Sequence, residues 1–169
     1  MKRILFYLLL GIGGVAAAWW LQRTFLSEEA RIRRTITHLL ADASFTRGTG
    51  NIAKAAKFNA LVARFTDDIS INIEQIVPAA IPLSGHDDLH HAAQAIFTLF
   101  KFCEVTLHDV VAGSIDGDQR TARAAFTASA MTDRTGQEFS AQEFEVQLRK
   151  NTEGVWQISQ ITAVRTLKR

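Results

Sequence analysis

Four stretches toward the C-terminal end of the chain alternate apolar and polar side chains with a period of two, and no other feature restricts the fold as much. The clearest is residues 139–150, where Phe144, Val146 and Leu148 alternate with charged or amide side chains. Short runs rich in Gly, Asp and Asn separate the stretches. Period two indicates half-buried strands, and short turns join antiparallel strands. Residues 105–167 therefore predict an antiparallel meander with one covered face.

Three segments before the meander carry their apolar residues at helical spacing instead. They are residues 27–45, a second helix after Gly50, and residues 84–103. Residues 67–76 alternate with period two, and they predict one further strand between the second and third helices. The helices must cover the apolar face of the strands. We therefore expect an α+β fold with three helices packed on a mostly antiparallel sheet.

The N-terminal segment is apolar for about the length of a membrane span. Residues 4–22, beginning with Ile4, contain no charged side chain. A helix that crosses a bilayer needs about 20 apolar residues. Trp19 and Trp20 stand at one end of this run, where aromatic rings would meet the lipid headgroups. The segment therefore predicts one transmembrane helix.

We expect residues 1–26 to be a membrane anchor and residues 27–169 to be a single domain. A cleaved signal sequence is the alternative, and it would leave the domain secreted. Lys2 and Arg3 favour an N-terminus in the cytoplasm, hence an inner-membrane protein whose domain lies outside the cytoplasm. Basic residues after the apolar run favour the reverse orientation, in which they could lie on anionic lipid.

Charge is distributed unevenly along the chain. Residues 23–64 carry eight Lys/Arg and three Asp/Glu, whereas residues 65–169 carry nine and fourteen. The predicted sheet is therefore acidic and has no aromatic pair on an exposed face, which argues against nucleic-acid binding. The single Cys103 excludes an intramolecular disulfide and a zinc ribbon.

The stretch HDDLHH, residues 86–91, holds three of the five histidines of the chain. His86 and His90 have the i, i+4 spacing of a two-histidine metal site, but such a site needs a third ligand. A helix start explains more of the stretch, with Ser84 as N-cap and Asp87 completing a capping box. A surface proton switch made of the two histidines is the third alternative. We predict no metal and no cofactor.

The last turn carries a motif that resembles a known superfamily. Residues 149–158 read RKNTEGVWQI, a charged strand end, a turn containing glycine and Trp-x-Ile on the final strand. With the order of elements over residues 27–168, this resembles the nuclear transport factor 2-like superfamily, which includes ketosteroid isomerase-like and polyketide-cyclase-like proteins. The resemblance implies a cone-shaped domain whose strongly bent sheet encloses a hydrophobic pocket. Such pockets serve isomerases, dehydratases, carriers, dimer modules and scaffolds, so the fold does not decide the function.

Polar residues in register with apolar strand positions are the candidates for such a pocket. Asp109 is expected on the face of Leu107 and Val111, where desolvation would raise its pKa and suit it as a general base. The alternative is that Asp109 reaches water at a bulge or strand end. The expected pocket-lining residues are Gln142, Phe144, Trp156, Gln160 and Thr162.

One absence weighs against catalysis. Isomerases of this superfamily use a tyrosine with a protonated acid, and the only tyrosine here is Tyr7, inside the apolar run. We therefore expect a membrane-anchored, non-catalytic binding or assembly module with an apolar pocket. Its expected partners are the membrane, a second copy through the sheet face, and a small apolar ligand or a partner protein. The alternatives are an isomerase- or cyclase-type enzyme with Asp109 as base, and a carrier of hydrophobic ligands at the membrane.

Overall fold

The computed structural model describes residues 27–74, 82–133 and 138–164, without the side chains of residues 138–140. The chain divides into two compact units, residues 1–31 and residues 32–169. In the part that is described, no helix is long and apolar enough to span a bilayer. The predicted anchor, with Ile4, Trp19 and Trp20, lies outside the described residues, so the anchor and the domain boundary stay predictions.

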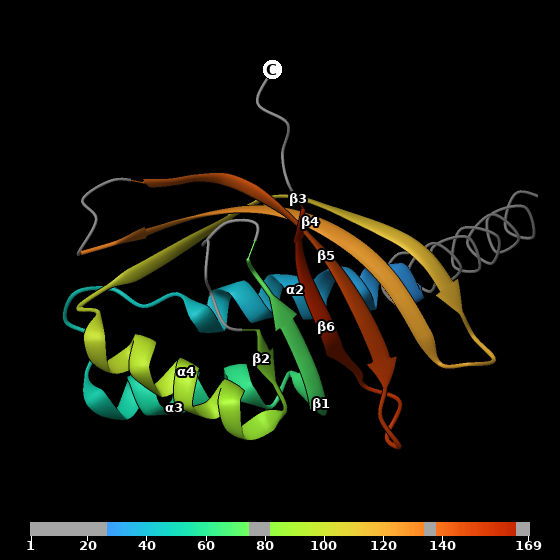
Figure 1. The fold of residues 1–169 in the computed structure, drawn as a ribbon, viewed down its shortest axis with the longest axis horizontal. Helices are drawn as coiled ribbons and strands as arrows, with labels where there is room; N and C mark the ends of the chain where they lie inside the picture. Colours follow the sequence, from blue (N-terminus) through green and yellow to red (C-terminus); the bar gives the residue numbers. More distant parts are fainter. Residues whose placement is uncertain (1–26, 75–81, 134–137, 165–169) are drawn as a thin grey trace, which may run out of the picture. The chain divides into compact units, whose positions relative to one another are not determined.

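The described elements confirm the α+β class (Figure 1). In chain order they are α2 (Glu28–Ala43), α3 (Asn51–Val62), β1 (Phe65–Asn72), β2 (Leu83–Ser84), α4 (His86–Leu99), β3 (Cys103–Asp116), β4 (Thr121–Thr132), β5 (Glu138–Lys150) and β6 (Trp156–Val164). The three predicted helices and the predicted strands are all present. The two-residue strand β2 was not predicted.

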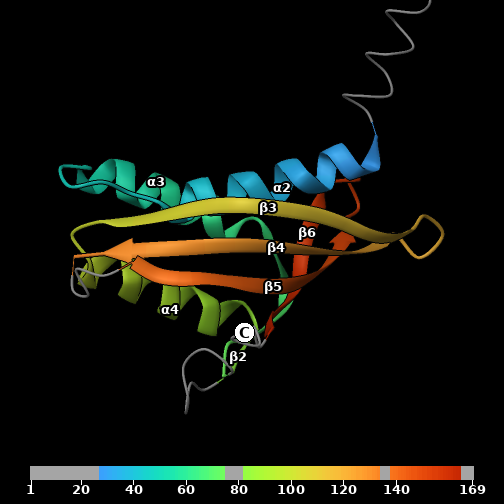
Figure 2. The same ribbon diagram turned by 90° about the horizontal axis from the view of Figure 1, so that it is seen from above.

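The six strands form one sheet in the order β2-β1-β6-β5-β4-β3. Neighbouring strands pair antiparallel, with one exception: β1 runs parallel to β6. This confirms the mostly antiparallel prediction. A parallel pair needs a long connection, and here α4 and the meander β3–β5 supply it. The long strands of the meander curve, and α2 runs beneath β3 and β4 (Figures 1 and 2).

The inner face of the sheet, which faces the helices, is apolar. Ala122, Ala124, Phe126 and Ala128 alternate along β4 and are all buried. The short alanine side chains leave space for the larger residues beside them, such as Val146 and Leu148 of β5. The apolar stripe of α2 fills the same core, through Ile32, Ile36, Leu39 and Leu40. Each such large side chain contributes about 1.5–3 kcal/mol when fully buried.

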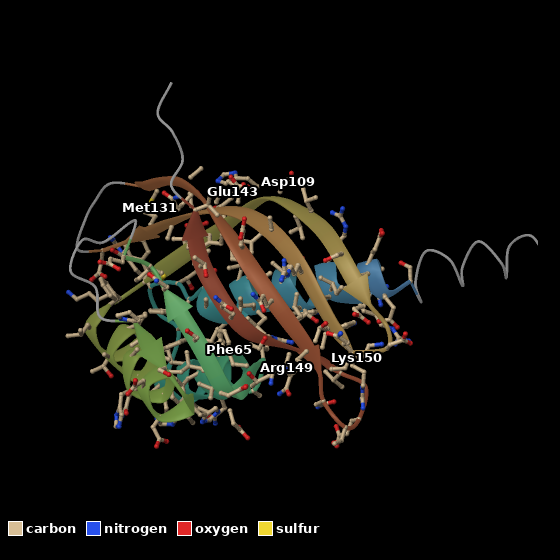
Figure 3. The ribbon with its side chains drawn as sticks, turned by 45° about the vertical axis from the view of Figure 1, so that its right-hand side comes forward. Phe65, Asp109, Met131, Glu143, Arg149 and Lys150 are labelled. Atoms are coloured by element: carbon tan, nitrogen blue, oxygen red, sulfur yellow. The ribbon has the colours of Figure 1, made fainter. Side chains whose placement is uncertain are left out.

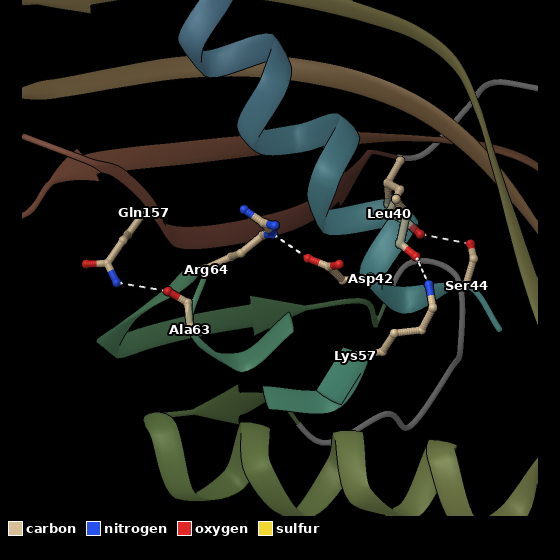
Figure 4. Close-up of polar contacts among 8 residues, drawn as sticks. Leu40, Asp42, Ser44, Lys57, Ala63, Arg64 and Gln157 are labelled. Carbon is tan, nitrogen blue, oxygen red and sulfur yellow. Dashed lines mark hydrogen bonds and ion pairs between the residues drawn. The ribbon is translucent and has the colours of Figure 1, made fainter. Parts of the chain in front are cut away.

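Polar contacts join the ends of α2 and α3 to β1 and β6 (Figure 4). Arg64 Nε lies 2.6 Å from Asp42 Oδ2, which links the start of β1 to the end of α2. Lys57 Nζ donates to the carbonyl of Ala41, at 2.8 Å. Gln157 of β6 donates to the carbonyl of Ala63, at 3.1 Å. The last two of these bonds satisfy carbonyls that the ends of the helices leave without helical partners.

Helix α4 begins one residue later than predicted. Its N-cap is Gly85, with φ +88°, and not Ser84. The predicted role of Asp87 is taken by Asp88, whose Oδ2 accepts a hydrogen bond from the amide of Ser84, at 3.2 Å. Gly85 also donates its amide to Ile69 of β1, at 2.7 Å, which holds the start of the helix against the sheet edge.

Replacement of Gly85 by alanine should destabilise the domain by about 1–2 kcal/mol, because an L side chain is strained at positive φ. Gly50 is the matched control: it is the N-cap of α3, but its φ is −64° and no atom would lie within 4 Å of an added Cβ. Urea denaturation of wild type, Gly85→Ala and Gly50→Ala measures the difference. Equal stability of the two variants would contradict the assigned conformation.

The thiol of Cys103 should be almost unreactive in the folded chain. Burial raises its pKa, so the thiolate, which is the nucleophile, is scarce at neutral pH. Iodoacetamide at pH 8 should therefore label Cys103 slowly in buffer and rapidly in denaturant, as followed by mass spectrometry. Equal rates under both conditions would show that Cys103 is accessible.

Candidate functional site

Asp109 lies on the outer face of the sheet, the face turned away from the helices. The pairing of β3 with β4 shifts register between Leu107 and Asp109, so His108 is an additional residue in β3. A β-bulge of this kind reverses the alternation of faces beyond it. Val110, and not Asp109, then points inward, and Asp109 is exposed. The expectation that Asp109 and Leu107 share a face is therefore wrong, and the structure agrees with the alternative, in which Asp109 reaches water at a bulge. The role of Asp109 as a base stays a prediction.

A second bulge moves Gln160 and Thr162 to the outer face. Leu148 of β5 pairs with Ile158, but Gln147 pairs with Gln160, so Ser159 is the additional residue of β6. Trp156 and Ile158 stay buried on the inner face. The expectation that Gln160 and Thr162 share the face of Trp156 is wrong for the same physical reason as for Asp109.

The outer face carries rows of polar residues across the strands. Asp109 and Glu143 both pair with Thr127, so two carboxylates flank one hydroxyl (Figure 3). Beside this row lies a hollow of about 380 Å³ that Gln160 and Thr162 help to line. Arg123, Glu145 and Gln147 supply further polar groups there. The hollow is polar, unlike the apolar pocket that the sequence predicts.

Gln142 and Phe144 lie on the inner face, as predicted. Gln142 pairs with Ala128, and Phe144 pairs with Phe126, whose ring it stacks on at 5.1 Å between centroids. Gln142 donates its side-chain amide to the carbonyl of Val164. Trp156 is buried at the other end of the same face, beneath the ammonium group of Lys150 at 4.9 Å from the ring centroid. The five expected pocket residues are thus divided between two faces.

The inner face is half-exposed at the end that holds Gln142 and Phe144. We call six residues at this end the inner site: Val105, Leu107, Ala128, Ala130, Gln142 and Phe144. Five of the six are half-buried, although the inner-face positions of β4–β6 further along are fully buried. Val105, Leu107 and Phe144 pack against the core cluster that contains Leu40 of α2 and Leu89 of α4. Apolar side chains on the helix-facing side of a sheet are ordinarily buried, so their partial exposure marks this end as a candidate binding surface.

The inner site has apolar chemistry with a single amide. None of its six residues is ionisable. The six residues of the inner site provide van der Waals contact and one hydrogen-bonding group, the amide of Gln142. This combination suits a small apolar or aromatic molecule. They provide no proton donor or acceptor for acid–base catalysis.

The histidines of HDDLHH do not converge on a metal. Within residues 27–74, 82–133 and 138–164, no group of three or more His, Cys, Asp or Glu side chains could hold a metal ion. His90 instead packs edge-on against Phe58 of α3, with 4.6 Å between ring centroids.

The bulge at Ser159 was outside the reach of sequence patterns, because serine is not a residue type that signals a bulge. A bulge near Asp109 is one of the alternatives that the sequence leaves open, but its place at His108 depends on the pairing of β3 with β4. The sequence does show that Ala122, Ala124 and Ala128 alternate, which indicates short side chains on one face of β4. Which larger residues fill the space beside these alanines depends on the strands that pair with β4, and the sequence pattern of β4 does not contain that information.

Comparison with solved structures shows the same fold in bacterial proteins. A protein from Novosphingobium aromaticivorans, provisionally named scytalone dehydratase, has a TM-score of 0.65 and 14% identity, over 86% of this chain and 89% of its own. An NTF2-like protein with a cystatin-like fold from the same organism has a TM-score of 0.62 and 15% identity, over 88% and 86%. A provisionally assigned NTF2-like dehydratase from Streptomyces avermitilis has 0.60 and 14%, over 82% and 96%. At such identities the likeness shows the fold alone.

No curated protein matches the sequence significantly. The family comparison does give a match: residues 28–162 correspond to the SnoaL-like domain, which is most of the chain and nearly all of the predicted domain. This agrees with the resemblance drawn from the element order and the final Trp-x-Ile turn. The chain belongs to the family of SnoaL-like domains and has an NTF2-like fold.

Proposed function

We propose that this protein is a non-catalytic binding module that takes a small apolar or aromatic molecule at the inner site. One observation carries the proposal: the inner site is apolar, half-exposed and free of ionisable side chains. Held by the predicted anchor, such a module would act at a membrane, either in an assembly or as a carrier of hydrophobic ligands.

A hydrophobic ligand would lie across β3, β4 and β5. Leu107 and Phe144 would contact it from the strands on either side, and the short side chain of Ala130 would leave room between them. Gln142 would set the orientation of a polar substituent. Its side-chain amide already donates to Val164, so the ligand would have to share or replace that bond.

The proposal includes the homodimer expected from the sequence, formed through the outer face of the sheet. The outer face carries Arg123 and Glu145 within one hollow, together with the exposed Val111. A twofold axis through that face would bring opposite charges of two copies together, which favours a self-complementary contact.

We expect Ala130→Phe to block ligand binding, because the added ring would occupy the space over β4. Ala125→Phe, on the same strand but facing outward, is the matched control. Native mass spectrometry of the full chain released from micelles should show a bound small molecule in wild type and Ala125→Phe, and its loss in Ala130→Phe. The same spectra report the dimer. Retention of the ligand by Ala130→Phe would place binding elsewhere, and circular dichroism would check folding, since overpacking can destabilise by about 1–3 kcal/mol.

An enzyme is the second candidate, and the row Asp109, Thr127, Glu143 is the observation in its favour. Paired carboxylates can divide acid and base roles, and two of the fold relatives are provisionally named dehydratases. Asp109 lies on the opposite face from the inner site, however, and is exposed.

Asp109→Asn should therefore leave ligand retention unchanged and alter the free energy of unfolding by less than about 0.5 kcal/mol, as is usual for an exposed position. Native mass spectrometry and urea denaturation measure the two quantities. Should a compound from a substrate screen be turned over by wild type and not by Asp109→Asn, the enzyme alternative would replace the binding module.

A further inference from the structure

Helices α3 and α4 leave an apolar groove between them on the surface. It has a volume of about 430 Å³. It is lined by Asn51, Lys54, Ala55, Phe58, His90, Gln94, Phe97 and Thr98. The rings of Phe58 and Phe97 meet edge-on, with centroids 6.0 Å apart. The groove is separate from the inner site, because none of its residues belongs to the sheet.

Large apolar side chains at the same end of the helix pair are exposed, although helical spacing placed them in buried stripes. Ile52, next to Asn51 in α3, is 89% exposed, and Leu99, next to Thr98 in α4, is 53% exposed. Ile96 of α4 is exposed as well. Scattered apolar residues on a surface need no explanation, but a cluster beside an apolar groove indicates an interaction surface.

This surface is also basic. Residues 43–66 and 86–103, which supply α3 and α4, contain five Lys/Arg and two Asp/Glu; both acids, Asp87 and Asp88, lie in the first turn of α4, at the other end of the helix from Leu99. Lys54 Nζ is held over the end of α4, where it donates to the carbonyls of Phe97 and Phe100, at 3.4 and 3.3 Å. Arg47 is held over the ring of Phe102, at 4.9 Å from its centroid. The nearby acids are Glu104, at the start of β3, and Asp133, which accepts a hydrogen bond from the amide of Lys101, at 3.0 Å.

The opposite side of the domain is acidic. The outer face of the sheet carries Asp109, Glu143 and Glu145 together with Arg123, all of them exposed. Positive charge therefore exceeds negative charge at the end of the helix pair that carries Ile52 and Leu99, and negative charge exceeds positive charge on the far face of the sheet. A negatively charged plane would attract the first and repel the second, so it would orient the domain.

We propose that the α3–α4 surface docks on an anionic lipid bilayer, with Ile52 and Leu99 entering the headgroup region and Arg47 and Lys101 facing lipid phosphates. A combination of apolar and basic side chains on one surface is the chemistry of peripheral membrane binding. Charge complementarity selects this occupant over an apolar peptide helix, which would leave the basic residues without a function. The docking rests on neither the ligand at the inner site nor the predicted anchor.

The test places the full chain in nanodiscs that contain a lipid with a paramagnetic headgroup. Methyl resonances close to that headgroup broaden. In discs with phosphatidylglycerol, the methyl signals of Ile52 and Leu99 should broaden, while that of Val111 on the outer face should not. In discs of phosphatidylcholine alone, the broadening of Ile52 and Leu99 should be much weaker.

Matched variants separate the contributions. Arg47→Glu should abolish the dependence on phosphatidylglycerol, whereas Arg120→Glu, the same change at the turn between β3 and β4, should not. Leu99→Gln should weaken the broadening of Ile52, whereas Val155→Gln should not, although Val155 and Leu99 are each 53% exposed. Broadening that is equal at Val111 and Ile52, or equal in both kinds of disc, would overturn the proposal. So would signals of Ile52 and Leu99 that shift only when an amphipathic peptide is added.

Discussion

Helix α2 packs its buried apolar stripe on the inner face of the sheet, and the other features of the domain depend on this contact. Ile32 and Ile36 are completely buried, and so is Ile158 of β6. β4 presents short alanine side chains to the helices at Ala122, Ala124 and Ala128, with Phe126 between them. The contact covers one face of the sheet, so it decides which side chains are withdrawn from water and which remain exposed.

The two β-bulges have the largest consequences for function. Each adds one residue to a strand, and one residue is enough to transfer every later side chain to the other face. In β3 the added His108 transfers Asp109 outward, and in β6 the added Ser159 transfers Gln160 and Thr162. The hydrogen-bonding groups that could have accompanied an apolar ligand thus lie on the outer face. Among the six residues of the inner site, Gln142 alone has a polar side chain, and the proposed binding function rests on this chemistry.

The charge distribution gives the domain two unlike sides. Basic residues lie on α3 and at the end of α4, and carboxylates lie on the outer face of the sheet. Lys54 and Lys57 also stabilise helix ends, since each donates to carbonyls in the last turn of a neighbouring helix. The same side chains thus hold the helices together and supply the positive charge of the helical surface.

Period and turn composition alone determined the class, the order of elements and the antiparallel meander, because hydrophobic alternation and the chemistry of Gly, Asp and Asn act locally. Tertiary structure alone decided the rest. Strand pairing set the bulges, and with them the faces of Asp109, Gln160 and Thr162. The start of α4 depended on a hydrogen bond from Gly85 to a distant strand, which moved the cap away from Ser84. Ile52, Ile96 and Leu99 lie at helical spacing with the other apolar residues of α3 and α4, but they are exposed because only part of each apolar stripe packs against the core. The burial of a residue depends on the elements that pack against it in the folded domain, and the sequence of a single strand or helix does not specify those elements.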